Sequence, residues 1–114
     1  PASWTAASRS FGEGLPGADS AESGLKEDTS IHWHGLLVPF QMDGVPGISF
    51  PGIRARETFV YEYTLKQHGS HMYHPHADEM TQMAMGMMGF WVTHPKARHP
   101  LIDEVQRDFC FLLS

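Results

Sequence analysis

Residues 29–38 read TSIHWHGLLV, a run rich in β-branched and aromatic residues that Pro39 closes. This composition predicts a β-strand. Because residues i and i+2 of a strand project from the same face, His32 and His34 point in one direction and Trp33 points in the other. The strand therefore offers two imidazoles side by side, and imidazole is a ligand for transition metals.

Further strand signals follow a long loop, residues 39–52, which carries Asp-Gly and Pro-Gly turn dipeptides. Residues 57–66, ETFVYEYTLK, alternate between two faces, one of which carries Phe59, Tyr61, Tyr63 and Leu65. More short strands are predicted at 71–76, 88–94 and 105–113, with one short helical turn within 77–87. Several short strands without a long amphipathic helix predict an all-β fold, an antiparallel sandwich or barrel.

The chain of 114 residues suffices for one domain and is too short for two independent cores. Residues 1–28, rich in Ala, Ser and Gly, show no period of two or 3.6 and are predicted to form an irregular or disordered arm before a domain at 29–114. The net charge of −5 and the scattered basic residues argue against a nucleic-acid or anionic-lipid partner. No membrane-spanning run and no signal peptide are visible, so a soluble chain is expected.

A second histidine pair occurs at His74 and His76, separated by Pro75. The proline fixes φ and removes a backbone donor, which suits an edge position beside a site. A single H-x-H pair favours exposed strand histidines, whereas two pairs in a β context favour a metal site. Imidazoles without carboxylate or thiolate suit copper that meets dioxygen, or catalytic zinc. The remaining histidines are expected to be solvated: His68, His71, His94 and His99.

Three segments resemble the multicopper oxidases, the family of laccases and bacterial copper-resistance oxidases. They follow one another in the family's order: TSIHWHGLLVPFQMDGVPG at 29–47, ETFVYEYTLKQHGSHMYHPH at 57–76, and GMMGFWVTHP at 86–95. The resemblance implies the first cupredoxin domain of a three-domain oxidase. It therefore implies an all-β, cupredoxin-like Greek-key β-sandwich or barrel.

The resemblance also implies a role for each matched residue. His32 would bind a mononuclear type 2 copper, and His34, His74 and His76 would bind the binuclear type 3 coppers. The Asp43 carboxylate would help to deliver protons to oxygen, although an Asp-Gly turn residue is an equal interpretation. The family completes this trinuclear cluster with four more histidines and accepts electrons at a type 1 copper held by a His-Cys-His motif. Neither feature occurs here, so we expect this chain to supply half of a trinuclear site.

Other departures from the family lie near the two ends. Cys110 has no adjacent histidine and is predicted to be a buried strand cysteine rather than a copper ligand. Residues 105–113 resemble the first strand of the family's second domain. Residues 1–28 do not match the strands that should precede H-W-H-G, so the sheet is expected to be incomplete or rebuilt at its N-terminus.

A cluster of methionines follows the second histidine pair: Met80, Met83, Met85, Met87 and Met88, with Met72 just before the pair. Thioether sulfur prefers Cu(I), so the cluster is a candidate for collecting cuprous ion. Flexible methionine also fills irregular gaps, and packing is the preferred interpretation.

The favoured function is a copper-binding domain of a laccase-like oxidoreductase that couples substrate oxidation to oxygen reduction. Its expected partners are copper ions, dioxygen, a phenolic or metal-ion reductant, and either a second copy of the chain or a missing domain. The family's location is periplasmic or secreted. The alternative is a non-catalytic copper-binding or sequestration module. A zinc hydrolase has little support, because Glu79 stands where its H-x-H-x-D-H motif needs histidine.

Overall fold

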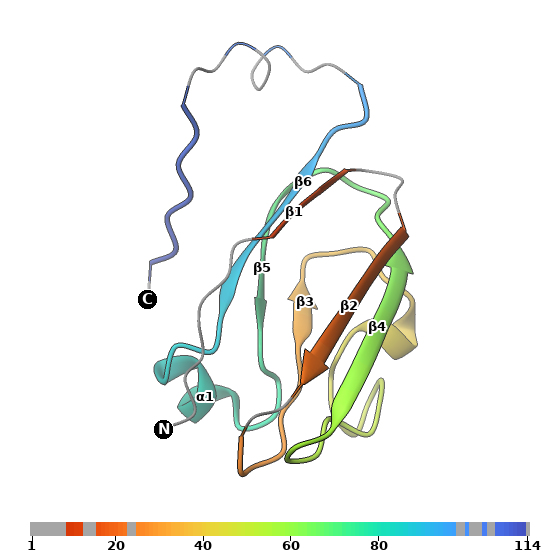
Figure 1. The fold of residues 1–114 in the computed structure, drawn as a ribbon, viewed down its shortest axis with the longest axis vertical. Coiled ribbons are helices and arrows are strands. Elements are labelled where there is room, and N and C mark those ends of the chain that lie inside the picture. Colours follow the sequence, from red (N-terminus) through yellow and green to blue (C-terminus); the bar gives the residue numbers. More distant parts are fainter. Residues whose placement is uncertain are drawn as a thin grey trace.

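The computed structural model describes residues 9–12, 16–22, 25–97, 100, 104 and 107–113. A four-stranded sheet has the order β1-β6-β5-β3, and a second sheet pairs β2 with β4 (Figure 1). The strands are β1 (Arg9–Gly12), β2 (Pro16–Glu22), β3 (His32–His34), β4 (Thr58–Thr64), β5 (Gly69–His74) and β6 (Gly89–His94). A 3₁₀ turn, η1 (Phe40–Met42), follows β3, and a short helix, α1 (Glu79–Ala84), connects β5 to β6. The prediction of an all-β fold is confirmed.

The aromatic residues of β3 and β4 build the centre of the core. On β4, Tyr61 and Tyr63 are buried whereas Val60 and Glu62 are exposed, as the alternation of this segment predicts. Trp33 is 3% exposed, and its ring lies 5.2 Å from that of Tyr61 and 5.8 Å from that of Tyr63. Offset and edge-on aromatic pairs of this kind add to the stability gained from burial. Burial of Trp33 turns its two histidine neighbours away from the core.

The predicted strand at 29–38 is shorter in the structure. Only β3 is a strand, because Gly35 adopts φ +83° and the Leu36 N–H donates a hydrogen bond to the Trp33 carbonyl at 3.1 Å, which reverses the chain. Before β3, Thr29 forms a two-way backbone bridge with Ile53. The strands predicted at 57–66 and 88–94 appear as β4 and β6, and the extended segment predicted at 71–76 appears as β5, which begins earlier, at Gly69, and ends at His74.

The prediction of an irregular arm at 1–28 is wrong for residues 9–12 and 16–22, which form strands, whereas residues 25–28 have no regular structure. Residues of β2 pair with the whole of β4 in antiparallel register, and β1 pairs with β6 in parallel register. The expected sheet was antiparallel throughout, so the β1–β6 pair is a second difference. Backbone hydrogen bonds to an existing strand edge can hold a segment whose side chains have low strand propensity. The local composition of a segment does not reveal that such a strand edge is available to it.

The strand predicted at 105–113 is also wrong where the structure describes it. Residues 107–113 have no strand neighbour, and Cys110 is exposed rather than buried. An extended segment becomes a strand only when another strand pairs with its N–H and C=O groups. Among the described residues, no helix has the length and apolar character needed to cross a membrane.

Candidate metal centre

The antiparallel pairing of β3 with β5 brings the two histidine pairs together. In this register His32 lies opposite His74, and Trp33 lies opposite Tyr73. Residues directly opposite one another in a ladder share a face. Tyr73 therefore lies on the inward face with Trp33, and His74 lies on the outward face with His32. The pairing therefore places His32 and His74, from two separate motifs of the sequence, on one side of the sheet.

All four predicted imidazoles lie close together. The His32 ring centroid is 5.6 Å from that of His34 and 5.3 Å from those of His74 and His76. The shortest nitrogen contact joins His34 Nδ1 to His74 Nε2 at 3.1 Å. Within the described residues, ligand atoms of His32, His34 and His74 all lie within 4.8 Å of one another. The two motifs thus form one cluster, with His76 at its edge.

Hydrogen bonds set which nitrogen of each ring is available. His32 Nδ1 lies 2.7 Å from the Asp43 carbonyl oxygen, and His74 Nδ1 lies 2.8 Å from the Pro75 carbonyl oxygen. A carbonyl only accepts, so Nδ1 carries the proton in both neutral rings and Nε2 keeps its lone pair. His34 is different, because its Nδ1 is the atom that faces the cluster. The main chain therefore orients two of the imidazoles for metal binding through Nε2.

The donor set fits a copper ion. Metal–imidazole bonds are about 2.0–2.1 Å long, so two nitrogens on one ion lie roughly 3 Å apart when they are neighbours in the coordination sphere. The 3.1 Å between His34 Nδ1 and His74 Nε2 meets that requirement. Burial lowers the pKa of His74 below its ordinary value near 6.5, with its repulsion from His32 and His34 as smaller contributions, which favours the neutral form that binds metal.

The loop after β3 contacts the His32 ring through Asp43. Asp43 contacts the ring mainly through its main-chain carbonyl, while its carboxylate Oδ1 lies 3.5 Å from His32 Nδ1 and its side chain is 34% exposed. Gly44 follows with φ +77°, and a Cβ atom there would lie 2.6 Å from the Ile31 carbonyl carbon and still closer to its oxygen. Only glycine permits this approach, so the Asp-Gly dipeptide both forms a turn and supports the His32 ring.

Two polar residues near the cluster were not predicted from the sequence. Glu79, the first residue of α1, places Oε1 3.6 Å from His74 Nδ1 and Oε2 4.0 Å from His76 Nδ1. Ser30 is fully buried and accepts a hydrogen bond from the His76 main-chain N–H. The available signal was position: Glu79 follows H-P-H by three residues, and Ser30 precedes H-W-H by two.

The other described histidines are not part of this cluster. His68 and His94 are exposed as predicted. His71 is not solvated: it is partly buried, its Nε2 is buried without a hydrogen-bond partner, and burial lowers its pKa. His99 lies outside the described residues.

The methionine cluster divides into two kinds of environment. Met87 is 3% exposed, and its sulfur lies 3.4 Å from the Thr29 hydroxyl oxygen, so it packs as predicted. Met80 and Met85 are 88% and 78% exposed, so the packing interpretation is wrong for these two.

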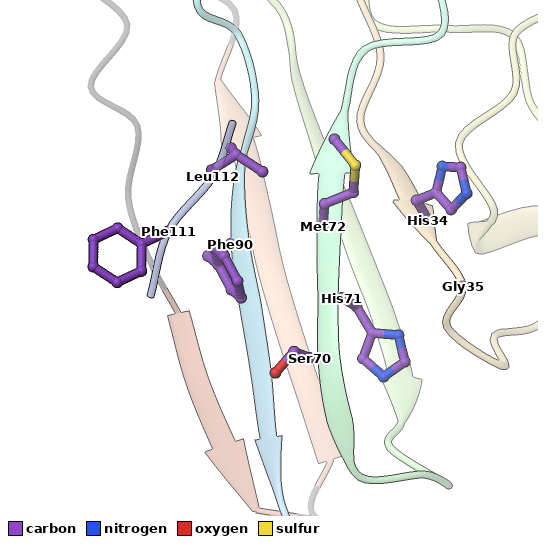
Figure 2. Close-up of a pocket in the computed structure, with 8 residues that line it drawn as sticks. All are labelled: His34, Gly35, Ser70, His71, Met72, Phe90, Phe111 and Leu112. Atoms are coloured by element: carbon purple, nitrogen blue, oxygen red, sulfur yellow. The ribbon is translucent and has the colours of Figure 1, made fainter. Parts of the chain in front are cut away.

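A shallow groove opens beside the cluster. Figure 2 shows it along β5, between His34 and the C-terminal residues Phe111 and Leu112, with Met72 and Phe90 on its wall. Its volume is about 380 Å³. The histidine cluster therefore borders a largely apolar recess.

Comparison with known proteins agrees with this geometry. The family model described as multicopper oxidase matches residues 21–98. Copper resistance protein A of Escherichia coli is 55% identical over 90 residues, which cover 79% of this chain and 14% of that protein. Its homolog from Pseudomonas syringae pv. tomato is 44% identical over 80 residues, 70% of this chain and 13% of that protein. The chain thus spans a small part of the length of these relatives.

Solved structures agree with the fold. The crystal structure of a multicopper oxidase from Pseudomonas thermotolerans matches with a TM-score of 0.80 at 30% identity, over 82% of this chain and 23% of that one. A blue copper oxidase from Nitrosomonas europaea matches with a TM-score of 0.76 at 29% identity, over 84% and 31%. The prediction of a cupredoxin-like fold is confirmed.

Proposed function

Because this chain belongs to the multicopper oxidase family and copper is the cofactor of that family, we propose that its four clustered histidines supply half of a type 2/type 3 copper site. The observation that carries the proposal is the 3.1 Å approach of His34 Nδ1 to His74 Nε2, at a cluster that also contains His32. His32 would hold the type 2 copper; His34, His74 and His76 would hold the type 3 coppers. The activity proposed for the complete enzyme is that of a laccase-like oxidoreductase.

Copper held by these histidines would supply the redox chemistry for the reduction of dioxygen. The protein's own part is to hold the imidazoles and manage protons. The Asp43 and Pro75 carbonyls keep a proton on Nδ1 of His32 and His74, which leaves the opposite nitrogens unprotonated. We propose that the Asp43 carboxylate passes protons between solvent and the site; its distance of 3.5 Å from His32 Nδ1 and its partial exposure to water support this role.

The proposal requires ligands beyond this cluster. Four more histidines would come from a further domain or from a second copy of the chain, whose equivalent face would meet this one across a symmetric contact. The relatives are several times longer than this chain, so the reductant, phenolic or metal ion, and a periplasmic location stay proposals drawn from the family.

The test is copper binding by the purified chain and by three single variants. His34→Ala and His76→Ala remove members of the cluster, and His94→Ala is the matched control, an exposed histidine at the end of β6. We expect Cu(II) binding without the intense blue colour of a copper–thiolate centre, a marked loss of affinity in the first two variants, and no loss in the control. Equal affinity in all four proteins would refute the site.

Activity separates the oxidase from the simpler alternative. We expect slow copper-dependent oxidation of a phenol that follows the oligomer fraction and falls in His34→Ala. A non-catalytic copper-binding module is the second candidate, favoured by the exposed thioethers of Met80 and Met85. Copper binding with no oxidation in any oligomeric state would support that module. Rapid turnover by a verified monomer would contradict the half-site.

A further inference from the structure

The Ser30 hydroxyl connects the two histidine motifs outside the strand ladder. Ser30 is 0% exposed and lies two residues before His32. Its Oγ accepts hydrogen bonds from the main-chain N–H groups of His76, at 2.7 Å, and Ala77, at 3.1 Å. These donors are 46 and 47 residues away along the chain. One hydroxyl therefore fastens the segment that enters β3 to the turn that leaves β5.

The two histidines of the second pair are held in different ways. His74 is the last residue of β5, where it pairs with His32 and has its Nδ1 at the Pro75 carbonyl. His76 lies beyond the end of β5, with 38% of its side chain exposed. Pro75 between them has no N–H to offer a neighbouring strand. The position of the His76 ring therefore depends on what fixes the turn at 75–77.

We propose that Ser30 is a positioning residue for His76, holding the turn so that this imidazole faces the other three. The inference rests on the proposed function, since it takes His76 as a copper ligand. A hydroxyl oxygen has two lone pairs and can accept both N–H groups at once. An aliphatic side chain of the same size would fill the space and leave both donors unpaired. The hydrogen bonds, and not the volume, are the active feature.

The experiment compares Ser30→Thr with Ser30→Val in the full chain. Threonine and valine have the same shape, so the pair isolates the hydroxyl oxygen. Loss of a group that orients a metal ligand typically weakens metal binding about 10- to 100-fold. We expect that loss of Cu(II) affinity, with a changed electron paramagnetic resonance spectrum, in the valine variant, and values close to wild type in the threonine variant.

A double-mutant cycle distinguishes positioning from general destabilisation. In a His76→Ala background there is no ring to position, so Ser30→Val should not weaken copper binding further. Thr29→Val is the control: this neighbouring hydroxyl is also buried but donates to Gln82 and not to the histidine turn. We expect it to lower stability and leave copper affinity unchanged. An equal loss of affinity from Ser30→Val with and without His76 would overturn the proposal.

Hydrogen exchange on the metal-free protein supplies a readout that does not depend on copper. The N–H groups of His76 and Ala77 should be protected in the wild type and in Ser30→Thr, and exposed to exchange in Ser30→Val. Absence of protection in the wild type would contradict the inference. If the wild type binds no copper but these N–H groups are protected only in the proteins with a hydroxyl at residue 30, the proposed function is refuted and the role of Ser30 in fixing the turn is supported. Should the valine variant fail to fold, Ser30→Ala removes the same oxygen without added volume and is judged by the same outcomes.

Discussion

Replacing Gly44 with alanine should damage both the fold and the metal centre. An added Cβ would lie 2.6 Å from the Ile31 carbonyl carbon, which would have to retreat to about 3.4 Å for an ordinary contact. The obstacle is backbone and not the end of a flexible side chain, so the loop itself must move. Asp43, the preceding residue, would move with it, and the 2.7 Å hydrogen bond from His32 Nδ1 to the Asp43 carbonyl would break.

The size of the effect follows from two contributions. A non-glycine residue in the left-handed region costs about 1–2 kcal/mol, and the lost hydrogen bond costs about 0.5–1.5 kcal/mol. We therefore expect Gly44→Ala to lower the free energy of unfolding by roughly 1.5–3.5 kcal/mol, before the cost of moving the loop. Gly47→Ala is a matched control, because Gly47 has a similar φ of +74° in the same loop and nothing within 4 Å of an added Cβ.

Urea denaturation of the metal-free proteins measures the difference, and competition with a copper chelator measures the effect on the site. Gly47→Ala should lose only the stability that the positive φ costs and should keep wild-type copper affinity. Gly44→Ala should lose more stability and should also bind copper more weakly. Equal destabilisation of the two variants, with equal copper affinity, would refute the claim that the close contact supports His32.

Four further outcomes are expected. Asp43→Asn keeps the main-chain carbonyl, so copper content measured by elemental analysis should be unchanged, while oxygen reduction by the assembled enzyme slows about tenfold or more. Burial lowers the pKa of His71 below 6.5, so the unfolded chain takes up protons that the folded chain resists: unfolding free energy of the metal-free protein should fall as pH drops below 6.5, less steeply in His71→Gln, and an unchanged slope would contradict this. The Tyr61 hydroxyl accepts the Ile31 N–H at 3.1 Å, so thermal unfolding should show Tyr61→Phe to be less stable by about 1–3 kcal/mol. Because Cys110 has no adjacent histidine and is not in the cluster of His32, His34 and His74, Cys110→Ser should leave the Cu(II) absorption spectrum unaltered.

The parts of the molecule that could be predicted from sequence are those where side-chain pattern and environment agree. The alternation of 57–66 reappears in the buried Tyr61 and Tyr63 of β4 because one face of that strand packs on the core. The outward projection of His32 and His34 follows from the inward burial of Trp33. The resemblance predicted that the two H-x-H motifs would meet. The way in which they meet, with His32 opposite His74, depends on the β3–β5 register, which only the structure gives.

The failures share one physical cause, which is dependence on a distant partner. Residues 16–22 form a strand because the edge of β4 is available to pair with them. The sequence PGADSAE contains no signal that predicts this pairing. The reverse holds at 105–113, where VQRDFCFLL has strand propensity but no strand pairs with the described residues 107–113. Ser30 and Glu79 were missed for the same reason, since their importance lies in contacts with a histidine turn that the sequence alone does not place.

The direct opposition of His32 and His74 ties copper binding to the quality of folding. A shift of β5 against β3 by one residue would bring Tyr73 to the position that His74 should occupy, because side chains alternate between the two faces of a strand. A chain paired in that way offers no nitrogen there, so on the proposed ligand set the metal would bind only the correctly aligned sheet. Each tenfold excess of copper over its dissociation constant then favours that sheet by about 1.4 kcal/mol. Copper would then select for the correct strand register. A molecule with β5 misaligned against β3, however compact, would lack bound metal, and metal content would distinguish it from correctly folded molecules.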